Sequence, residues 1–203
     1  MYVRDAKNRD EVWLLDHIEE MELDETTFRS RDYVIAIDEQ TNEKAGFGRI
    51  RLHKTGAETE RSPSGQGEGG EICELTSIGV LDHWRRQGVG AHVVERLVET
   101  ATDQGYETVY SLTDEPRYLA QFGFEAIETD ELPTVLQHRL SEKRESLAPE
   151  AVPMAIDSGA FEMPTRLRER FKHASEQVPE DEPEETPEDF GIDSESATYK
   201  YDI

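Results

Sequence analysis

The sequence has little cysteine, little lysine and no long hydrophobic run. Its single cysteine, Cys73, excludes an internal disulfide and fits a reducing compartment. No stretch approaches the roughly 18 apolar residues of a membrane-spanning helix. Met1 opens a polar segment that lacks the apolar core of a signal peptide. We therefore expect a cytoplasmic protein that does not act at a membrane.

Positive charge is also scarce. The chain has 22 basic residues, against 46 acidic ones, and its formal net charge is −24. Because no basic stripe could displace counterions from a phosphate backbone, binding to nucleic acid is not expected. The acidic residues also decorate a well-patterned helix, at Glu95, Glu99 and Asp103. This pattern is typical of proteins kept soluble in a very salty cytoplasm, where salt screens the repulsion between like charges.

Hydrophobic patterning divides the chain into three parts. Residues 1–157 show strand and helix patterns in the order β-α-β-β-β-α-β-α-β-α-β. This order predicts a mixed α/β (α+β) domain in which helices cover both faces of one sheet. The pattern of residues 158–174 predicts a short helical extension after this domain. Residues 175–203 are rich in acidic side chains and poor in apolar ones, which predicts a disordered tail.

The octet RRQGVGAH, residues 85–92, lies between a predicted strand and a predicted helix. The first N–H groups of a helix lack partners, and the helix dipole is positive at that end. Glycines there let an anion approach closely, so the octet can hold a phosphate or pyrophosphate group. The alternative is that the glycines only let the helix pack tightly on the strand.

Two common phosphate loops do not fit the octet. A P-loop requires Gly-Lys-Ser/Thr, whereas Gly90 is followed by Ala91 and His92. A dinucleotide fingerprint requires Gly or Ala three residues after Gly90, where Val93 stands. It also belongs to the first β-α unit of a domain, and this turn follows several strands.

The pattern that fits is Arg/Gln-x-x-Gly-x-Gly/Ala, filled by Arg85, Gly88 and Gly90. With its flanking strand and helix, it resembles motif A of the GNAT N-acetyltransferases, which binds acetyl-coenzyme A (acetyl-CoA). Further along, YLAQFGFEAIE at residues 118–128 resembles motif B of the same family. The resemblance covers residues 2–156.

The resemblance implies the GNAT fold, a mostly antiparallel mixed sheet that splays apart at the cofactor strand. It also implies acetyl-CoA as co-substrate, and the six histidines show no metal-ligand spacing, so no metal is expected. In the family, one strand pairs through its backbone with the pantetheine arm, and the following loop wraps the pyrophosphate. The matching strand residues are Ile78, Gly79 and Val80, and the matching loop residues are Arg85, Arg86, Gln87, Gly88, Val89, Gly90 and Ala91.

Two residues are candidates for proton transfer. Glu74 lies 14 residues before Gly88, the spacing of the catalytic glutamate in the histone-acetylating branch of the family. Burial beside the cofactor is expected to raise its pKa toward neutrality, which suits a general base; the alternative is an exposed strand glutamate. Many members protonate the leaving thiolate with a tyrosine of motif B. Leu119 occupies that position here, so Tyr118, one residue earlier, is the candidate. The alternatives are that Tyr118 packs in the core and that transfer needs no acid.

The acceptor is less well defined. The segments ELPTVLQHRL and VPMAID resemble those of the branch that acetylates free amino acids, and a peptide or protein amine is the competing acceptor. Loop 55–70 and segment 161–171 are where we expect specificity to lie. Arg49 and Arg51 are expected to point to the same side, where they face solvent or, as the alternative, an acidic group of the substrate. The alternative to an enzyme is a non-catalytic acyl-CoA-binding module whose acidic tail recruits a basic partner, and a homodimer is compatible with the sequence.

Overall fold

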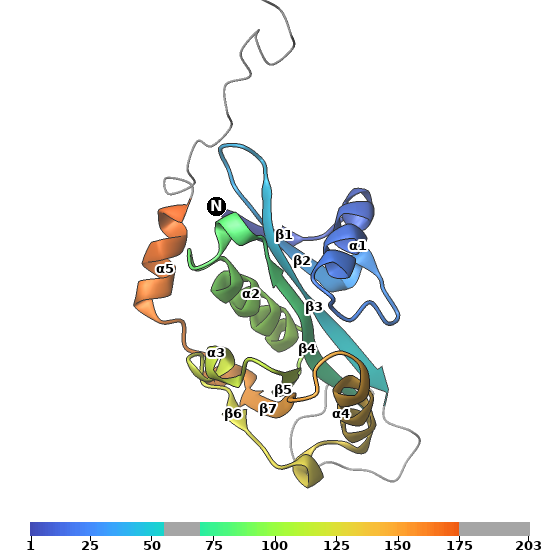
Figure 1. Ribbon diagram of the computed structural model, residues 1–203. Coiled ribbons are helices and arrows are strands. Elements are labelled where there is room, and N and C mark those ends of the chain that lie inside the picture. Colours follow the sequence, from blue (N-terminus) through green and yellow to red (C-terminus); the bar gives the residue numbers. More distant parts are fainter. Residues whose placement is uncertain (55–69, 175–203) are drawn as a thin grey trace, which may run out of the picture.

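The computed structural model describes residues 1–54 and 70–174, within which seven strands form one sheet in the order β1-β2-β3-β4-β5-β7-β6 (Figure 1). The strands are β1 (Tyr2–Asp5), β2 (Tyr33–Ile37), β3 (Lys44–Lys54), β4 (Glu71–Val80), β5 (Thr108–Thr113), β6 (Glu125–Ala126) and β7 (Val152–Asp157). The helices are α1 (Glu11–Glu20), α2 (Val89–Asp103), α3 (Pro116–Ala120), α4 (Thr134–Ser146) and α5 (Thr165–Lys172). The order of strands and helices through residue 157 is the one that the sequence predicts.

Every neighbouring pair of strands is antiparallel except β4 and β5, which run parallel. Helices cover both faces of the sheet, as expected. On one face, α2 packs an apolar stripe that includes Val93 and Leu97 onto the central strands. On the other face, α1 covers β2 and β3, and α4 covers β5. The mixed, mostly antiparallel fold expected from the sequence is therefore confirmed.

The parallel pair β4–β5 is short. The two strands pair at only three positions, Cys73 with Val109, Glu74 with Tyr110 and Leu75 with Ser111, and β4 then continues to Val80 without a partner on that side. Parallel strands that diverge leave a row of backbone N–H and C=O groups unpaired between them. The sheet is therefore open on the β5 side of residues 76–80.

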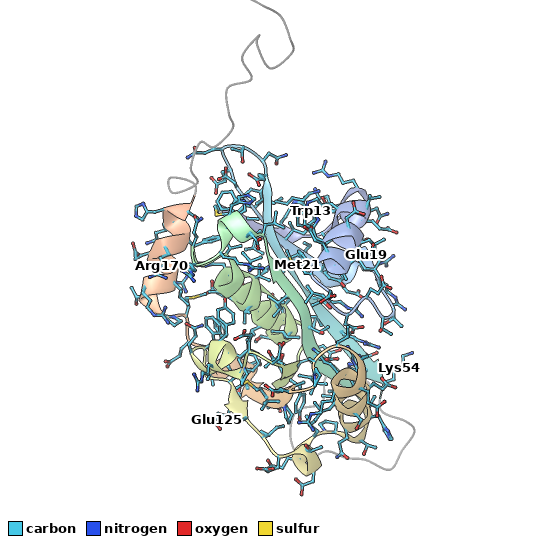
Figure 2. The ribbon with its side chains drawn as sticks, viewed as in Figure 1. Trp13, Glu19, Met21, Lys54, Glu125 and Arg170 are labelled. Carbon is cyan, nitrogen blue, oxygen red and sulfur yellow. The ribbon has the colours of Figure 1, made fainter. Side chains whose placement is uncertain are left out.

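Helix α5 is packed onto the domain. Leu167 and Phe171 of α5, followed by Ala174, belong to the same buried cluster as the apolar residues of α2. Figure 2 shows Arg170 on this helix, beside α2. The acidic tail 175–203 and most of loop 55–70 lie outside the described residues. Within residues 1–54 and 70–174, no helix is long and apolar enough to span a membrane.

Candidate active site

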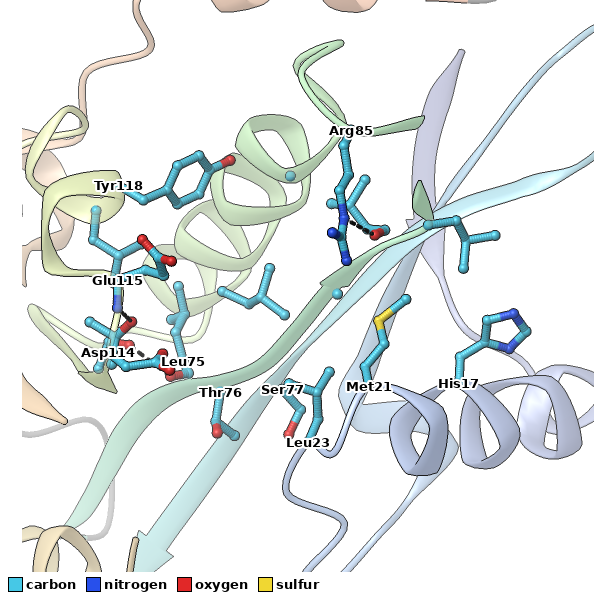
Figure 3. Close-up of a pocket in the computed structure, with 18 of the residues that line it drawn as sticks. His17, Met21, Leu23, Leu75, Thr76, Ser77, Arg85, Asp114, Glu115 and Tyr118 are labelled. Atoms are coloured by element: carbon cyan, nitrogen blue, oxygen red, sulfur yellow. Dashed lines mark hydrogen bonds between the residues drawn. The ribbon is translucent and has the colours of Figure 1, made fainter. Parts of the chain in front are cut away.

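A cleft of about 950 Å³ lies where β4 and β5 diverge (Figure 3). Its walls include residues 75–82 from β4 and the turn after it, residues 111–115 from β5 and the turn after it, and Gly90 of α2. Tyr118 lines it from the α2 face of the sheet, and Lys143 lines it from the α4 face. The cleft is therefore bounded by residues from both faces, and it has the size of a small-molecule site.

A β-bulge shapes the β4 wall of this cleft. The register between β3 and β4 shifts between Phe47, which pairs with Gly79, and Arg49, which pairs with Thr76. Ser77 inside the bulge has a φ of +50°, and its hydroxyl donates to the carbonyl of Asp24 at 2.7 Å. A bulge turns a strand and redirects its backbone groups. The bulge thus lies in the part of β4 that is expected to bind the pantetheine arm.

Gly79 is required by packing. A Cβ at this position would lie 2.7 Å from both the sulfur of Met21 and the ring of Phe47. The side chains of Met21, after α1, and Phe47, in β3, therefore occupy the space that a side chain at residue 79 would need. Ile78 and Val80, on either side of Gly79, line the cleft, as their predicted role requires.

The glycine loop, residues 85–90, reaches one end of the cleft with its first and last residues, Arg85 and Gly90. Arg86 and Gly88 both have left-handed backbones, with φ of +63° and +81°. Alternating backbone conformations of this kind turn successive N–H groups toward a common point and make a site for an anion. Arg85 lines the cleft, and its Nε donates to the carbonyl of Val80 at 3.3 Å.

The remaining residues of this loop region offer backbone rather than side chains. The side chains of Val89 and Ala91, in the first turn of α2, are buried in the core. Gln87 is also buried, and its Nε2 donates to the carbonyl of His83 at 2.7 Å. The loop and the first turn of α2 thus combine free helix N–H groups with a positive dipole end, which suits a pyrophosphate.

Tyr118 lies against the start of α2. A Cβ on Gly90 would be 2.7 Å from the Tyr118 hydroxyl oxygen, so the glycine makes room for this side chain. Burial raises the pKa of Tyr118 to about 12, so the hydroxyl stays protonated at neutral pH and can donate. Leu119, which occupies the usual tyrosine position of the family, is buried in the core.

Glu74 is buried in a charged cluster and is not an exposed strand residue. One of its carboxylate oxygens, Oε2, lies 2.6 Å from Nε2 of His53 and 3.6 Å from Nε of Arg139. Desolvation alone would raise its pKa, but the hydrogen bond to His53 and the charge of Arg139 outweigh that effect and lower it. The expectation of a raised pKa is therefore wrong, because the sequence could not show these two partners.

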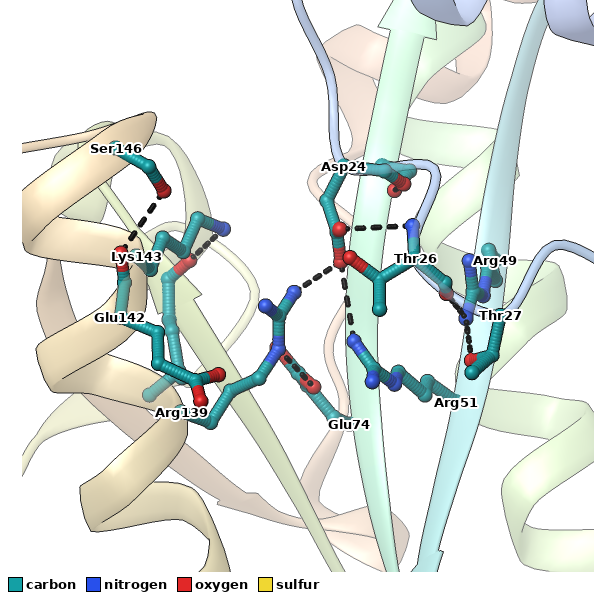
Figure 4. Close-up of polar contacts among 12 residues, drawn as sticks. Asp24, Thr26, Thr27, Arg49, Arg51, Glu74, Arg139, Glu142, Lys143 and Ser146 are labelled. Carbon is teal, nitrogen blue, oxygen red and sulfur yellow. Dashed lines mark hydrogen bonds and ion pairs between the residues drawn. The ribbon is translucent and has the colours of Figure 1, made fainter.

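The cluster extends to the loop after α1 (Figure 4). Asp24, at its centre, pairs with Arg139 of α4 and, at 3.2 Å, with Arg51 of β3. Arg49 is 1% exposed and donates to the carbonyl of Thr26 at 2.8 Å. The expectation that Arg49 faces solvent is therefore wrong, and Arg51 is only partly exposed. Both guanidinium groups are held by the loop after α1, which crosses over β3.

Two polar groups lie on this side of the cleft. The hydroxyl of Thr76 is buried and has no hydrogen-bond partner among residues 1–54 and 70–174. The amine of Lys143 donates to the carbonyl of Leu112 at 2.6 Å, beside the splay. Desolvation lowers the pKa of Lys143, although the nearby charge of Glu74 opposes this. One feature of the sequence indicates a cationic face on the helix that covers this side of the cleft. Arg139 and Lys143 are four residues apart and therefore share a helix face.

A mixed sheet that splays between parallel strands, beside a glycine loop at a helix N-terminus, is the arrangement of one class of acyltransferases that use coenzyme A. The sequence model described as "Acetyltransferase (GNAT) family" matches residues 2–124, more than half of the chain. The chain therefore belongs to the GNAT acetyltransferase family. No curated protein sequence matches it significantly.

Solved structures share this fold. N-acetylglutamate synthase from Neisseria gonorrhoeae, complexed with coenzyme A and N-acetyl-glutamate, matches 76% of this chain with a TM-score of 0.56 and 14% identity. The chain spans only 34% of that enzyme. Rv2747 from Mycobacterium tuberculosis, in complex with CoA and NLQ, matches 77% of this chain and 99% of its own, with a TM-score of 0.57 and 16% identity. At these identities, both establish the fold alone.

Proposed function

We propose that this protein is an N-acetyltransferase that transfers the acetyl group of acetyl-CoA to a primary amine. The observation that carries the proposal is the open gap between β4 and β5, which ends at the glycine loop. The gap offers strand backbone at residues 76–80 that pairs with no strand on the β5 side, and the loop offers helix N–H groups. These two features suit the two parts of the donor, an amide-bearing arm and a pyrophosphate.

The chain's own residues supply binding and proton transfer. Acetyl-CoA supplies the thioester that the amine attacks. Tyr118 is the proposed proton donor, because its protonated hydroxyl lines the cleft. Glu74 is the proposed proton acceptor, and since the cleft is lined by Leu75 and Thr76 but not by Glu74, it would act through water.

Direct transfer, without an acetylated enzyme, is proposed because of the state of Cys73. Its thiol is fully buried, and desolvation with the neighbouring charge of Glu74 raises its pKa to about 12. A thiol acts as a nucleophile only as the thiolate. Cys73 would therefore not carry the acetyl group, and the amine would attack while both substrates are bound.

The charges on the α4 side support an acceptor that carries a carboxylate beside its amine. Three cationic side chains meet two carboxylates there, namely Arg51, Arg139 and Lys143 with Asp24 and Glu74. Of these five groups, Lys143 lines the cleft, where its ammonium could pair with an acceptor carboxylate, and Asp114 of the cleft wall also faces this charge. Charge complementarity therefore favours an amino acid over a simple amine or a basic peptide.

The proposal predicts release of free coenzyme A when a suitable amine is added to the protein and acetyl-CoA. We expect the fastest release with free amino acids, acidic ones included. Matched amines in which the carboxylate is replaced by a carboxamide should react more slowly. Thiol release is measured with a colorimetric reagent, and the N-acetyl product is identified by mass spectrometry. Binding of acetyl-CoA without release for any amine would instead support the non-catalytic acyl-CoA-binding module.

We also propose that the acidic surface is adapted to high salt, which predicts a stability that rises with ionic strength. From 0.1 M to 1 M salt, the Debye length falls from about 10 Å to about 3 Å, so repulsion among the excess carboxylates weakens. A gain of about 2 kcal/mol would raise the Tm by roughly 4–8 °C. The Tm is measured by calorimetry in KCl, with an uncharged osmolyte as control. A Tm that stays constant or falls in KCl would contradict the adaptation.

A further inference from the structure

Helix α5 contacts the glycine loop, although no residue of α5 lines the cleft. Nη1 of Arg170 donates to the carbonyl of Arg86 at 3.3 Å. The carbonyl of Leu167 packs against Gly88 so closely that a Cβ there would be only 2.3 Å away. A segment about 80 residues later in the sequence thus contacts two loop residues, and both of them have left-handed backbones.

A second contact joins α5 to the first turn of α2. The ring of Phe171 stacks on the ring of His92, with centroids 3.8 Å apart and planes inclined by 11°. Nδ1 of His92 lies 3.0 Å from the carbonyl of Gly88 and donates to it. The loop carbonyls of Arg86 and Gly88 are therefore both held by side chains, one from α5 and one that α5 itself holds in place.

The loop depends on such support. A left-handed backbone is unfavourable for an arginine, whose Cβ crowds the adjacent carbonyl. In isolation, Arg86 would relax to another conformation, and the N–H groups of the loop would no longer converge. A hydrogen bond to the carbonyl of Arg86 favours the observed conformation directly, because it fixes the orientation of the following peptide group.

Charge reinforces this geometry. In a chain with a net charge of −24, the eight residues TRLRERFK of α5 include four cations and one carboxylate. Arg168 and Lys172 are paired, with Glu95 and Glu169 respectively. Arg170 forms no ion pair with a described carboxylate, and its charge stands beside a loop built to receive phosphate.

We propose that α5 is part of the donor site and that Arg170 is a positioning residue, which holds the glycine loop in its diphosphate-binding conformation through the Arg86 carbonyl. The inference rests on the proposed use of acetyl-CoA. It assigns to the segment after the sheet a role in donor affinity that neither motif of the sequence indicates.

The test compares two donors in the full-length protein carrying Arg170→Met. Acetyl-CoA contains the diphosphate, and S-acetylpantetheine lacks it. We expect the KM for acetyl-CoA to rise about three- to tenfold, the effect of losing one ordinary, solvent-exposed hydrogen bond, with kcat unchanged. The kcat/KM with S-acetylpantetheine should not change. Arg170→Lys can still donate to the carbonyl and should restore most of the affinity.

Arg168→Met is the matched control, because it removes the same charge from the same helix but loses only the bond to Glu95. It should leave the KM for acetyl-CoA unchanged. An equal loss of kcat/KM with both donors, or an unchanged KM for acetyl-CoA in Arg170→Met, would overturn the inference. Neither result would contradict acetyl transfer by the wild type. If the wild type binds coenzyme A in calorimetry but acetylates no amine, the activity proposal fails, and weaker binding in Arg170→Met would still support the positioning role.

Discussion

Gly88→Ala is expected to remove most of the protein's affinity for acetyl-CoA. Gly88 has a φ of +81°, and the new Cβ would lie 2.3 Å from the backbone carbonyl of Leu167 and 3.1 Å from the backbone nitrogen of Phe171. Neither contact can be relieved by rotating a side chain, so the loop or α5 must move. The left-handed conformation alone costs a non-glycine residue about 1–2 kcal/mol.

If the loop leaves its conformation, only a fraction of the molecules can bind the donor at any time. The apparent affinity for acetyl-CoA is then the intrinsic affinity multiplied by that fraction. A total of about 2–3 kcal/mol corresponds to a KM for acetyl-CoA roughly 30- to 150-fold higher. The KM is measured by thiol release, and the Kd for coenzyme A by calorimetry. The KM for the amine, extrapolated to saturating donor, should change much less.

Gly105→Ala is the matched control for this variant. Gly105, just after α2, has a φ of +83°, and a Cβ there would meet nothing within 4 Å. Gly105→Ala therefore forces alanine into the same left-handed conformation as Gly88→Ala, but without a steric clash. Residue 105 also lies at the end of α2 opposite to the glycine loop. We expect a lower Tm and an unchanged KM. If Gly105→Ala raised the KM as much as Gly88→Ala, global destabilisation would explain both, and the glycine loop would lose its special role.

Local patterns predicted the scaffold because local physics determines it. The apolar stripe of α2 needs only helical spacing, and the octet at residues 85–92 needs only its flanking strand and helix. A glycine inside a strand pattern, such as Gly79, indicates a bulge or a close approach of other groups to the backbone. The structure shows both, a bulge at residues 76–79 and the contact with Phe47.

The charged side of the site could not be predicted in the same way. The partners of Glu74 lie 21 residues before it and 65 residues after it, on different elements, and only tertiary packing brings them together. Asp24 lies in a loop without periodicity, yet this loop buries Arg49 and holds Arg51. The sign of a pKa shift depends on such partners, so burial alone gave the wrong direction for Glu74.

Glu74→Gln is expected to lower kcat by about two orders of magnitude and to destabilise the fold. General base catalysis contributes roughly 10²–10⁴-fold, and a base whose pKa lies below its ordinary value belongs at the lower end. Removing one partner of a buried charged cluster costs about 3 kcal/mol, because Arg139 is left with less compensation. The kcat is measured at saturating substrates, at a temperature where calorimetry shows both proteins folded.

Glu71→Gln is the control on the same strand. Its carboxylate accepts from the hydroxyl of Tyr106 at 3.1 Å, and neither residue lines the cleft. It should lose little stability and keep its kcat. If Glu74→Gln lost stability but also kept its kcat, the residue would be a structural member of the cluster, and the proton of the amine would leave by another route.

The pH dependence of Glu74 follows from the direction of its shift. Because the folded pKa lies below the ordinary value of 4.5, its contribution to stability is complete above about pH 4.5 and is lost as the pH falls through the folded pKa. The pKa of Asp24 is also lowered, so its contribution to stability is likewise lost in acid. Glu74→Gln should therefore lose most stability at neutral pH, and its free energy of unfolding should fall less steeply in acid than that of the wild type. The rate has the same sign: protonation of Glu74 would reduce kcat only below pH 4.5, so a fall in kcat centred between pH 6 and 7 must come from another group, such as the amine of the acceptor.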